Sequence, residues 1–518
     1  MENDEYRPEN PYLVSGIVSL AAFMEVLDTT IANVALSQIV GSMGASSEES
    51  TWILTSYLVS NGIVLPLSGW LSSLMGRKNF FILCITGFTL TSFLCGIATS
   101  LPMLIAFRLL QGFAGGGLQP VQQAMIKDNF PPEKWGTAFA ITGITTVLAP
   151  IIGPTLGGYI TDNYSWRWIF FMNVPVGILA AFLVNLLVQD PPSAQKKKVG
   201  SIDYIGLGLI AVGLGALQIV LDKGQQEDWF GSSFIILLTC LSAVGISLAV
   251  LWIWRQKNPI VDLRLFTIPS FSMPCIMIFF VGFALYSSTA LMPMLLQNNF
   301  GYDATLSGLV LSPAGISVLF MMILVGRLVN KIQARYLISF GLLLNALGMW
   351  ATGLVSPQTD FNTFVFIRIL QTLGLAFLFI PSTTLAFMKI SSEKSSNASA
   401  IVSLMRNLGG SVGIALVTNK LVHSQQIEQA ALSAHISAAD SVYQIALANY
   451  SQIMTHLGVP PAQVTTAAFW KMYQDLLHQA SILAFRDAYN FIAGILLVLA
   501  LVALLMPKNL PPKNNQIS

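Results

Sequence analysis

The sequence predicts an all-α integral membrane protein with fourteen transmembrane helices: two related six-helix blocks with two further helices inserted between them. Of the 518 residues, 54% are hydrophobic and only 10% are charged, whereas soluble domains carry roughly 25% charged residues. Apolar runs of about 20 residues, long enough to cross a bilayer as a helix, recur along the chain. Short segments of the first half also recur in the second half, in the same order.

The apolar runs define fourteen predicted spans, and an even number places both termini on one side of the membrane. Most of the 26 lysines and arginines lie at the span ends on that side. Because positive charge concentrates on the cytoplasmic side, we expect both termini to be cytoplasmic and the protein to lie in the inner (plasma) membrane. The predicted spans are 13–36, 51–74, 80–99, 102–126, 138–160, 166–188, 203–222, 232–255, 271–297, 305–327, 335–355, 361–388, 399–421 and 485–506.

Four regions follow from these spans. We expect an N-terminal six-helix bundle at 13–188, a basic cytoplasmic linker at 189–202 and two inserted helices at 203–255. The C-terminal six-helix bundle is expected at 271–506. The only long hydrophilic stretch, 422–484, falls inside that bundle on the outer side, with helical pieces interrupted by glycine and proline.

Two pairs of segments reveal the internal repeat. GWLSSLMGRKNFF after span two matches GRLVNKIQARYLI after span ten, and FRLLQGF in span four matches IRILQTL in span twelve. The second pair aligns Arg108 with Arg368 and Gln111 with Gln371. Parallel repeats of this kind build alternating-access transporters, in which the substrate site lies between the repeats near the membrane midplane.

Two acidic residues, Glu25 and Asp28, lie deep in the first predicted span. A charged side chain at the centre of a membrane helix costs roughly 2.5–3.5 kcal/mol on insertion scales. Three residues apart on a helix, the two carboxylates share one face. A membrane protein that retains such a pair is predicted to bind a cation or a proton with it.

Span four carries a polar stripe of Arg108, Gln111, Gly115, Gln119 and Gln122. At 100° per residue these positions fall on one face of a helix. A polar stripe through a span must face protein or water rather than lipid, so we expect this face to line the interior.

At these residues the chain resembles the major facilitator superfamily, in its fourteen-span drug/proton antiporter branch of the EmrB and QacA type. FMEVLDTTIANVAL at 23–36 is similar to the LDxTIxNVAL signature of the branch, and Arg108, Gln111 and Gly112 are similar to an R-x-x-Q-G motif. The resemblance implies that Asp28 is the main proton-coupling or cation-recognition carboxylate, with Glu25 beside it. The alternative is a structural pair neutralised by an intramembrane arginine.

The same resemblance implies that Arg108, with Gln111 and Gln119 on its face, adjoins the proton pathway; alternatively Arg108 bonds loop and helix-end carbonyls. Arg406, within SLMRNLGGSVGIAL, also matches the branch. It would pair either with Asp28 or with loop carbonyls, and the sequence does not decide between them.

GWLSSLMGRK at 69–78 resembles a cytoplasmic motif of the superfamily through Gly69, Gly76, Arg77 and Lys78. Ser73 stands where the family has an aspartate that helps to latch the two halves together. The departure implies that the latch is lost or that another acid supplies it. The glycines permit a tight turn and a close approach of helices.

APIIGPTLGGYI at 149–160 resembles the antiporter motif G-P-x-x-G-G through Gly153, Pro154, Gly157 and Gly158. Glycines four residues apart allow close helix packing, and the proline removes a backbone hydrogen bond and permits a bend. The family links this motif to export, so its expected role is geometric.

We therefore expect a proton-coupled multidrug efflux antiporter that exports small lipophilic, often cationic, compounds and is driven by the proton gradient without a cofactor. Aromatic and methionine side chains in spans nine and twelve suit such ligands. Two alternatives stay open. One is a proton-coupled exporter or importer of a specific metabolite or siderophore; the other is a non-transporting receptor or adaptor.

The sequence contains no motif that indicates enzyme activity, metal binding or nucleic-acid binding. It has no phosphate-binding G-x-x-x-x-G-K-[ST] loop and no H-E-x-x-H motif, so we expect no enzyme activity. The four cysteines lie in apolar runs and the four histidines match no ligand spacing, which predicts no metal site. A net charge of +2 gives no reason to expect nucleic acid as a partner.

The expected partners are a drug-like small molecule, protons and the lipid bilayer. The resemblance adds a periplasmic adaptor protein docked on 422–484.

Overall fold

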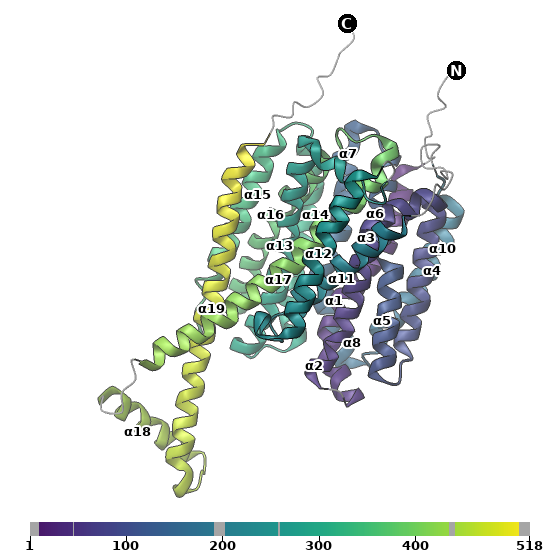
Figure 1. Ribbon diagram of the computed structural model, residues 1–518. Coiled ribbons are helices and arrows are strands. Elements are labelled where there is room, and N and C mark those ends of the chain that lie inside the picture. The colour runs from purple at the N-terminus through teal and green to yellow at the C-terminus, as the bar shows by residue number, and fades with distance from the viewer. Residues whose placement is uncertain (1–9, 45, 191–202, 257–258, 435–440, 507–518) are drawn as a thin grey trace, which may run out of the picture.

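The computed structural model describes residues 10–506 except for 45, 191–202, 257–258 and 435–440. Across this part of the chain all regular structure is helical, and 14 helical segments are long and apolar enough to cross a membrane. The predicted all-α class and the number of spans are confirmed. Most of the predicted linker, 189–202, lies outside the described residues. Figure 1 shows the spans as one bundle, with the start of its first helix and the end of its last helix on the same side, called here the side of the termini.

The first six spans are built from ten helices, because several spans are interrupted. The elements are α1 (Pro11–Met43), α2 (Ser47–Ser50), α3 (Trp52–Met75), α4 (Arg77–Gly96), α5 (Leu101–Gly115), α6 (Leu118–Asn129), α7 (Trp135–Gly143), α8 (Ala149–Asn163), α9 (Trp168–Phe171) and α10 (Asn173–Leu187). A π-helical turn, Ile144–Leu148, joins α7 to α8, directly before the prolines of α8. We call this set the N-half.

The inserted spans are α11 (Tyr204–Lys223) and α12 (Ser233–Arg255), and α11 packs on α3 while α12 packs on α11. The remaining helices form the C-half, which packs around its own buried apolar core. They are α13 (Pro269–Phe300), α14 (Ala304–Leu328), α15 (Ala334–Thr352), α16 (Phe361–Phe387), α17 (Ser395–Ala434), α18 (Ser441–His456) and α19 (Val464–Leu504).

Two helices run well past the predicted spans 399–421 and 485–506. α17 continues to Ala434, and α19 begins at Val464. Most of the predicted hydrophilic loop is therefore helix, because the first glycine or proline after α17 comes only at Gly458. With α18, these extensions project from the bundle on the side away from the termini (Figure 1). We call residues 422–434, 441–456 and 464–484 the α18 arm.

The two halves meet along a seam that is closed at both ends. At the end nearer the termini, Lys127 donates to the carbonyl of Ile390 at 3.1 Å and to the hydroxyl of Ser395 at 2.6 Å. At the end nearer the α18 arm, Thr155 of α8 donates to the carbonyl of Gly308 on α14 at 2.6 Å. The structure therefore represents a state in which neither end of the seam is open.

Close backbone contact at the termini end depends on Gly69 of α3. A Cβ atom placed there would lie 2.9 Å from both the Cα of Asn397 and the carbonyl oxygen of Ser396 on α17. Both neighbours are backbone atoms, so they can retreat only if the two helices separate. Gly62, two turns earlier on α3, has nothing within 4 Å of its would-be Cβ.

We therefore predict that Gly69→Ala lowers the melting temperature of the purified protein, because it forces α3 and α17 apart. Gly62→Ala is the matched control and should leave stability unchanged or raise it by up to about 1 kcal/mol through helix propensity. Thermal denaturation in detergent measures both variants. Equal melting temperatures for the two would show that the Gly69 contact is not a stabilising one.

Candidate functional site

Asp28 lies at the centre of a buried polar cluster in the N-half. Its Oδ2 forms an ion pair with Arg108 of α5 at 2.6 Å. Its Oδ1 accepts hydrogen bonds from Asn173 of α10 at 2.6 Å and from Gln111 of α5 at 3.3 Å. Three donors from two other helices thus hold one carboxylate of α1, and its charge is neutralised inside the bundle.

Arg108 is the only cation in contact with Asp28 among the described residues, and its other bonds fix its position. Its Nε donates to the carbonyl of Ile53 at 3.3 Å, and Nη1 also donates to Gln111 at 2.8 Å. The guanidinium lies 4.4 Å from the ring centroid of Tyr57, which adds a cation–π contact. Arg108 therefore bonds a carbonyl in the first turn of α3 as well as a carboxylate, and its place beside a proton pathway stays a prediction.

Glu25, one turn earlier on α1, is bonded only to neutral groups. Tyr57 and Asn61 of α3 donate to its Oε1 at 2.8 and 3.1 Å, and Gln119 of α6 donates to Oε2 at 2.6 Å. No lysine or arginine nitrogen of the described chain lies within 4.0 Å of it. Glu25 is 2% exposed. It is a buried carboxyl with hydrogen bonds but no ion pair.

Gln119 connects this carboxyl to the C-half. Its amide nitrogen bonds Glu25, and its amide oxygen accepts a hydrogen bond from Arg406 of α17. Arg406 also lies beside the hydroxyl of Tyr286 on α13. One amide group therefore links a carboxylate of the N-half to a guanidinium of the C-half, at the middle of the seam.

The structure brings all six predicted site residues into two adjoining clusters, and all six are buried. Asp28, Arg108 and Gln111 form the first, and Glu25, Gln119 and Arg406 form the second. Neither predicted partner of Arg406 is observed, because Gln119 stands between it and α1. The functional roles assigned to these residues stay predictions.

Four further residues complete the clusters. Tyr57, Asn61 and Asn173 were not singled out in the sequence, and Tyr286 is one of the span-nine aromatic residues expected to suit lipophilic ligands. Tyr57 and Asn61 lie one turn apart on α3, both 5% exposed or less. An asparagine in mid-span is a usable signal, since a buried amide requires polar partners. Tyr57 carried no comparable signal, because aromatic residues are common throughout membrane helices.

Arg77 of the cytoplasmic motif is paired with an acid other than the aspartate that Ser73 replaces. Arg77 forms an ion pair with Asp128 at the end of α6. It also donates to the hydroxyl of Ser396 at 2.9 Å and to the carbonyl of Ser392 at 3.1 Å, both in the C-half. Arg77 therefore reaches across the seam while its charge is balanced within the N-half.

A second acid, Asp190, accepts a hydrogen bond from the backbone nitrogen of Lys78 at 2.9 Å, at the start of α4. Gly76 precedes α4 with a φ of 82°, and a Cβ there would lie 2.8 Å from Asp190. Burial raises the pKa of the Asp190 carboxyl above its usual range, while the Lys78 hydrogen bond opposes that rise. The turn between α3 and α4 thus requires glycine for both its conformation and its space.

The glycine–proline segment of α8 packs against α1 on one side and α14 on the other. Cβ atoms at Gly153 and Gly157 would meet Thr30 and Ile31 of α1 at 2.1 and 3.1 Å. Pro154 and Gly158 are buried in the same helix. The helix therefore lies close to the backbone that carries Glu25 and Asp28, as expected of a geometric element.

Comparison with known proteins agrees with this arrangement. A sequence profile of the Major Facilitator Superfamily matches residues 18–414. This chain belongs to that superfamily. The multidrug export protein EmrB of Escherichia coli K12 is 36% identical over 483 residues, which cover 93% of this chain and 92% of EmrB. The fatty acid resistance protein FarB of Neisseria gonorrhoeae is 37% identical over 437 residues, covering 84% and 85% of the two chains.

Among solved structures, the human organic anion transporter MFSD10 superposes with a TM-score of 0.61 at 13% identity, covering 96% of this chain and all of that one. At this identity the likeness concerns the fold alone. The predicted superfamily and transporter fold are confirmed, and the chain is a multi-pass membrane protein.

We predict that Arg108→Gln lowers the free energy of unfolding by about 3–5 kcal/mol, because it leaves Asp28 as an unpaired buried charge. The double variant Asp28→Asn/Arg108→Gln should recover most of that loss. Arg368→Gln is the matched control. Arg368 is bonded to the neutral side chains of Gln371 and Thr289, so its removal strands no carboxylate. Unfolding titrations in mixed detergent measure the stability of all three variants. A double variant as unstable as Arg108→Gln would show that the loss does not come from an unpaired Asp28.

Proposed function

We propose that this protein is a multidrug exporter that exchanges small lipophilic compounds, often cationic, for protons. Its superfamily membership and its similarity to EmrB over nearly the whole chain support export of drug-like molecules. The observation that carries the proton coupling is Glu25: a buried carboxyl with no ion-pair partner in the described chain, bonded through Gln119 to the opposite half.

Proton binding at Glu25 would act on the seam through its hydrogen bonds. A charged carboxylate strengthens the bond from Gln119, because charge-assisted hydrogen bonds are roughly twice as strong as neutral ones. Gln119 then holds its oxygen toward Arg406. Protonation removes that charge, weakens the amide bridge and lets the two halves separate. Asp28 has a positioning role in this scheme, because its ion pair with Arg108 fixes the rotation of α1.

The free energy released by proton entry is large enough to drive export of a drug-like compound. One proton crossing 100 mV supplies about 2.3 kcal/mol, and each unit of pH difference adds about 1.4 kcal/mol. One proton per cycle would therefore sustain a gradient of several hundredfold for a neutral compound, since tenfold corresponds to about 1.4 kcal/mol. No cofactor is required in this scheme.

We further propose that the termini end of the seam faces the cytoplasm and the α18 arm faces outward. The excess of lysine and arginine on the termini side supports this orientation. Drug would then enter from the cytoplasmic side while Glu25 is charged, and protons would enter from the side of the α18 arm.

We predict that Glu25→Gln abolishes efflux driven by a pH gradient but leaves exchange of labelled for unlabelled drug intact. The amide is neutral and of the same size, and like a protonated carboxyl it accepts at one atom and donates at the other. It therefore imitates the protonated state and removes only the proton step. Everted vesicles with a pH-sensitive dye measure the first activity, and counterflow in proteoliposomes measures the second. The panel includes fixed cations and long-chain fatty acids, because FarB is named for fatty acid resistance.

Glu49→Gln provides the control, since Glu49 is an exposed residue of the short helix α2. It should retain both activities. Full pH-driven efflux by Glu25→Gln would assign the proton to another group. Loss of counterflow as well would show that Glu25 is needed to bind drug rather than to couple it.

The α18 arm is proposed as the docking site of a periplasmic adaptor protein. It extends beyond the bundle (Figure 1) and presents apolar side chains, with Ile427, Val442 and Ile445 at 52%, 69% and 62% exposure. Internal bonds stiffen the arm: Tyr450 donates to Asp475 at 2.6 Å, and Gln429 donates to Tyr473 at 2.8 Å. A stiff, projecting, apolar surface suits a protein partner.

We predict that Ile445→Glu reduces drug resistance of intact cells to the level of a strain lacking the pump, while transport in proteoliposomes is unchanged. A charge on the docking surface disrupts the partner contact but leaves the transport core intact. Thr455→Glu, an equally charged change at an exposed position about 80° around α18 from Ile445, should preserve resistance. A defect of Ile445→Glu in proteoliposomes would instead place the arm within the transport cycle.

A further inference from the structure

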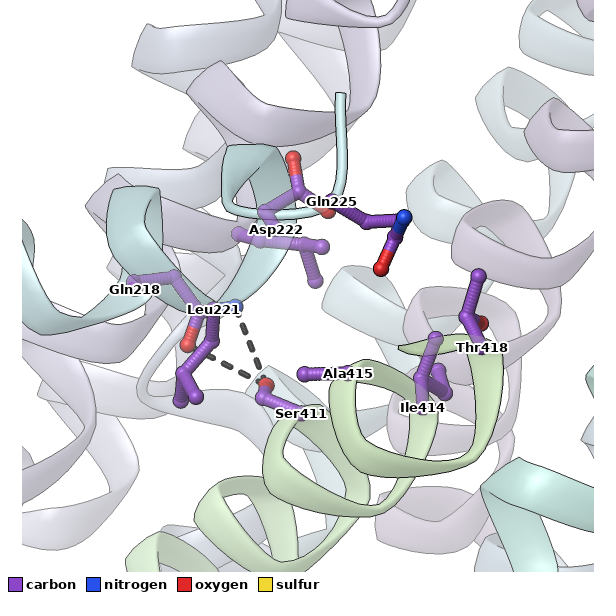
Figure 2. Close-up of a pocket in the computed structure, with 9 residues that line it drawn as sticks. Gln218, Leu221, Asp222, Gln225, Ser411, Ile414, Ala415 and Thr418 are labelled. Carbon is purple, nitrogen blue, oxygen red and sulfur yellow. Dashed lines mark hydrogen bonds between the residues drawn. The ribbon is translucent and has the colours of Figure 1, made fainter. Parts of the chain in front are cut away.

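A cleft between the inserted helix α11 and the C-half helix α17 is not used by the transport scheme above. α11 contributes Gln218 and Asp222 to its walls, and Gln225 follows in the turn after α11. α17 contributes Ser411 and Thr418 (Figure 2), and α3 of the N-half also borders the cleft. Apolar side chains of all three helices complete the lining. The cleft therefore lies where both halves and the inserted helices meet.

Asp222 gives this cleft a carboxylate in an apolar setting. It is half-buried, and its Oδ2 accepts a hydrogen bond from the neutral hydroxyl of Thr55 on α3. No lysine or arginine nitrogen of the described chain lies within 4.0 Å of its oxygens. Its neighbour Lys223 is engaged with Thr51 and Gln226 and lies over the ring of Trp52.

The cleft adjoins the central site along α17. Ser411 follows Arg406 by five residues, a rise of about 7.5 Å along a helix. Thr418 lies two turns further toward the α18 arm. The cleft therefore extends from the level of the Glu25–Gln119–Arg406 bridge toward the end of the seam near the arm.

One pair of hydrogen bonds joins the two walls of the cleft in this state. The amide nitrogen of Gln218 donates to the hydroxyl of Ser411 at 3.0 Å, and that hydroxyl lies 3.2 Å from the amide oxygen (Figure 2). The cavity between the walls measures about 80 Å³, room for a few waters only. A larger occupant would require Gln218 and Ser411 to separate, which is the movement that opens this end of the seam.

We propose that this cleft is a second binding site for organic cations, formed as α11 and α17 separate, on the route between the central site and the α18 side. The inference rests on the proposed export function. An organic cation would place its charge against Asp222 and its apolar body against the leucine, isoleucine and alanine side chains of the lining. Lys223 acts on Asp222 electrostatically but forms no ion pair with it among the described residues. A carboxylate without an ion pair, at the edge of an apolar cleft, favours a cation over an anion or a neutral compound.

The test compares substrates that differ in charge. Asp222→Asn should lower kcat/KM for export of tetraphenylphosphonium by about tenfold, which corresponds to about 1.4 kcal/mol, and leave export of uncharged chloramphenicol unchanged. Asp222→Glu should restore cation export. Thr55→Val, which removes the hydrogen bond but keeps the carboxylate, should retain the preference for the cation.

Calorimetry on the purified full-length protein measures binding of both compounds independently of transport. A roughly tenfold weaker affinity for tetraphenylphosphonium in Asp222→Asn, with chloramphenicol binding unaltered, supports the site. If affinity falls equally for both compounds, or for neither, the proposed site is wrong, because Asp222 then has no specific role in binding a cation. A wild-type protein that transports neither compound contradicts the proposed export function, and the binding measurement still decides the cation site.

Discussion

The buried ion pair between Asp28 and Arg108 is the interaction on which the rest of the structure depends. A lone charge in the middle of an apolar bundle costs several kcal/mol, so each of these groups is stable there only with the other and with further hydrogen bonds. Their partners come from α3, α5 and α10. The pair therefore fixes the rotation of α1 and, with it, the direction in which Glu25 points.

Because of this constraint, the two carboxylates of α1 lie one turn apart but have different bonding partners. Asp28 is neutralised by an arginine within its own half, whereas Glu25 is bonded to neutral groups and reaches the opposite half through a single amide. The internal repeat shows a similar difference between the two halves. Arg368 bonds Gln371 as Arg108 bonds Gln111, but its other partner is Thr289, a neutral hydroxyl. Of these two repeated arginines, only Arg108 of the N-half is paired with a carboxylate of the described residues.

The seam is held by contacts that are short-range and individually breakable, which suits a protein that must alternate between states. Arg77 and Lys127 reach C-half hydroxyls and carbonyls rather than carboxylates. Such bonds contribute about 0.5–1.5 kcal/mol each, or somewhat more where one partner is charged. Glycines at the crossing points, such as Gly69, let backbones meet without interlocking side chains. A seam of this kind closes firmly yet opens for a modest change in free energy.

The sequence by itself determined the class of the protein, the fourteen spans, the internal repeat and six residues of the two central clusters. Hydrophobic length and the high cost of buried charge are local properties, and Glu25, Asp28 and Arg108 stand out against an apolar background without any coordinates. Even the family's departure at Ser73 was visible, although the acids that bond the residues of this turn, Asp128 and Asp190, were not.

Only the tertiary structure decided which polar group meets which. Gln119 rather than Asp28 contacts Arg406, Glu25 rather than Asp28 lacks an ion pair, and the stretch after α17 is largely helix. The reason is geometric: a hydrogen bond requires atoms within about 3 Å, and that proximity depends on how helices from distant parts of the chain rotate and pack. Periodicity gives the face of a helix, but not the neighbour that the face meets.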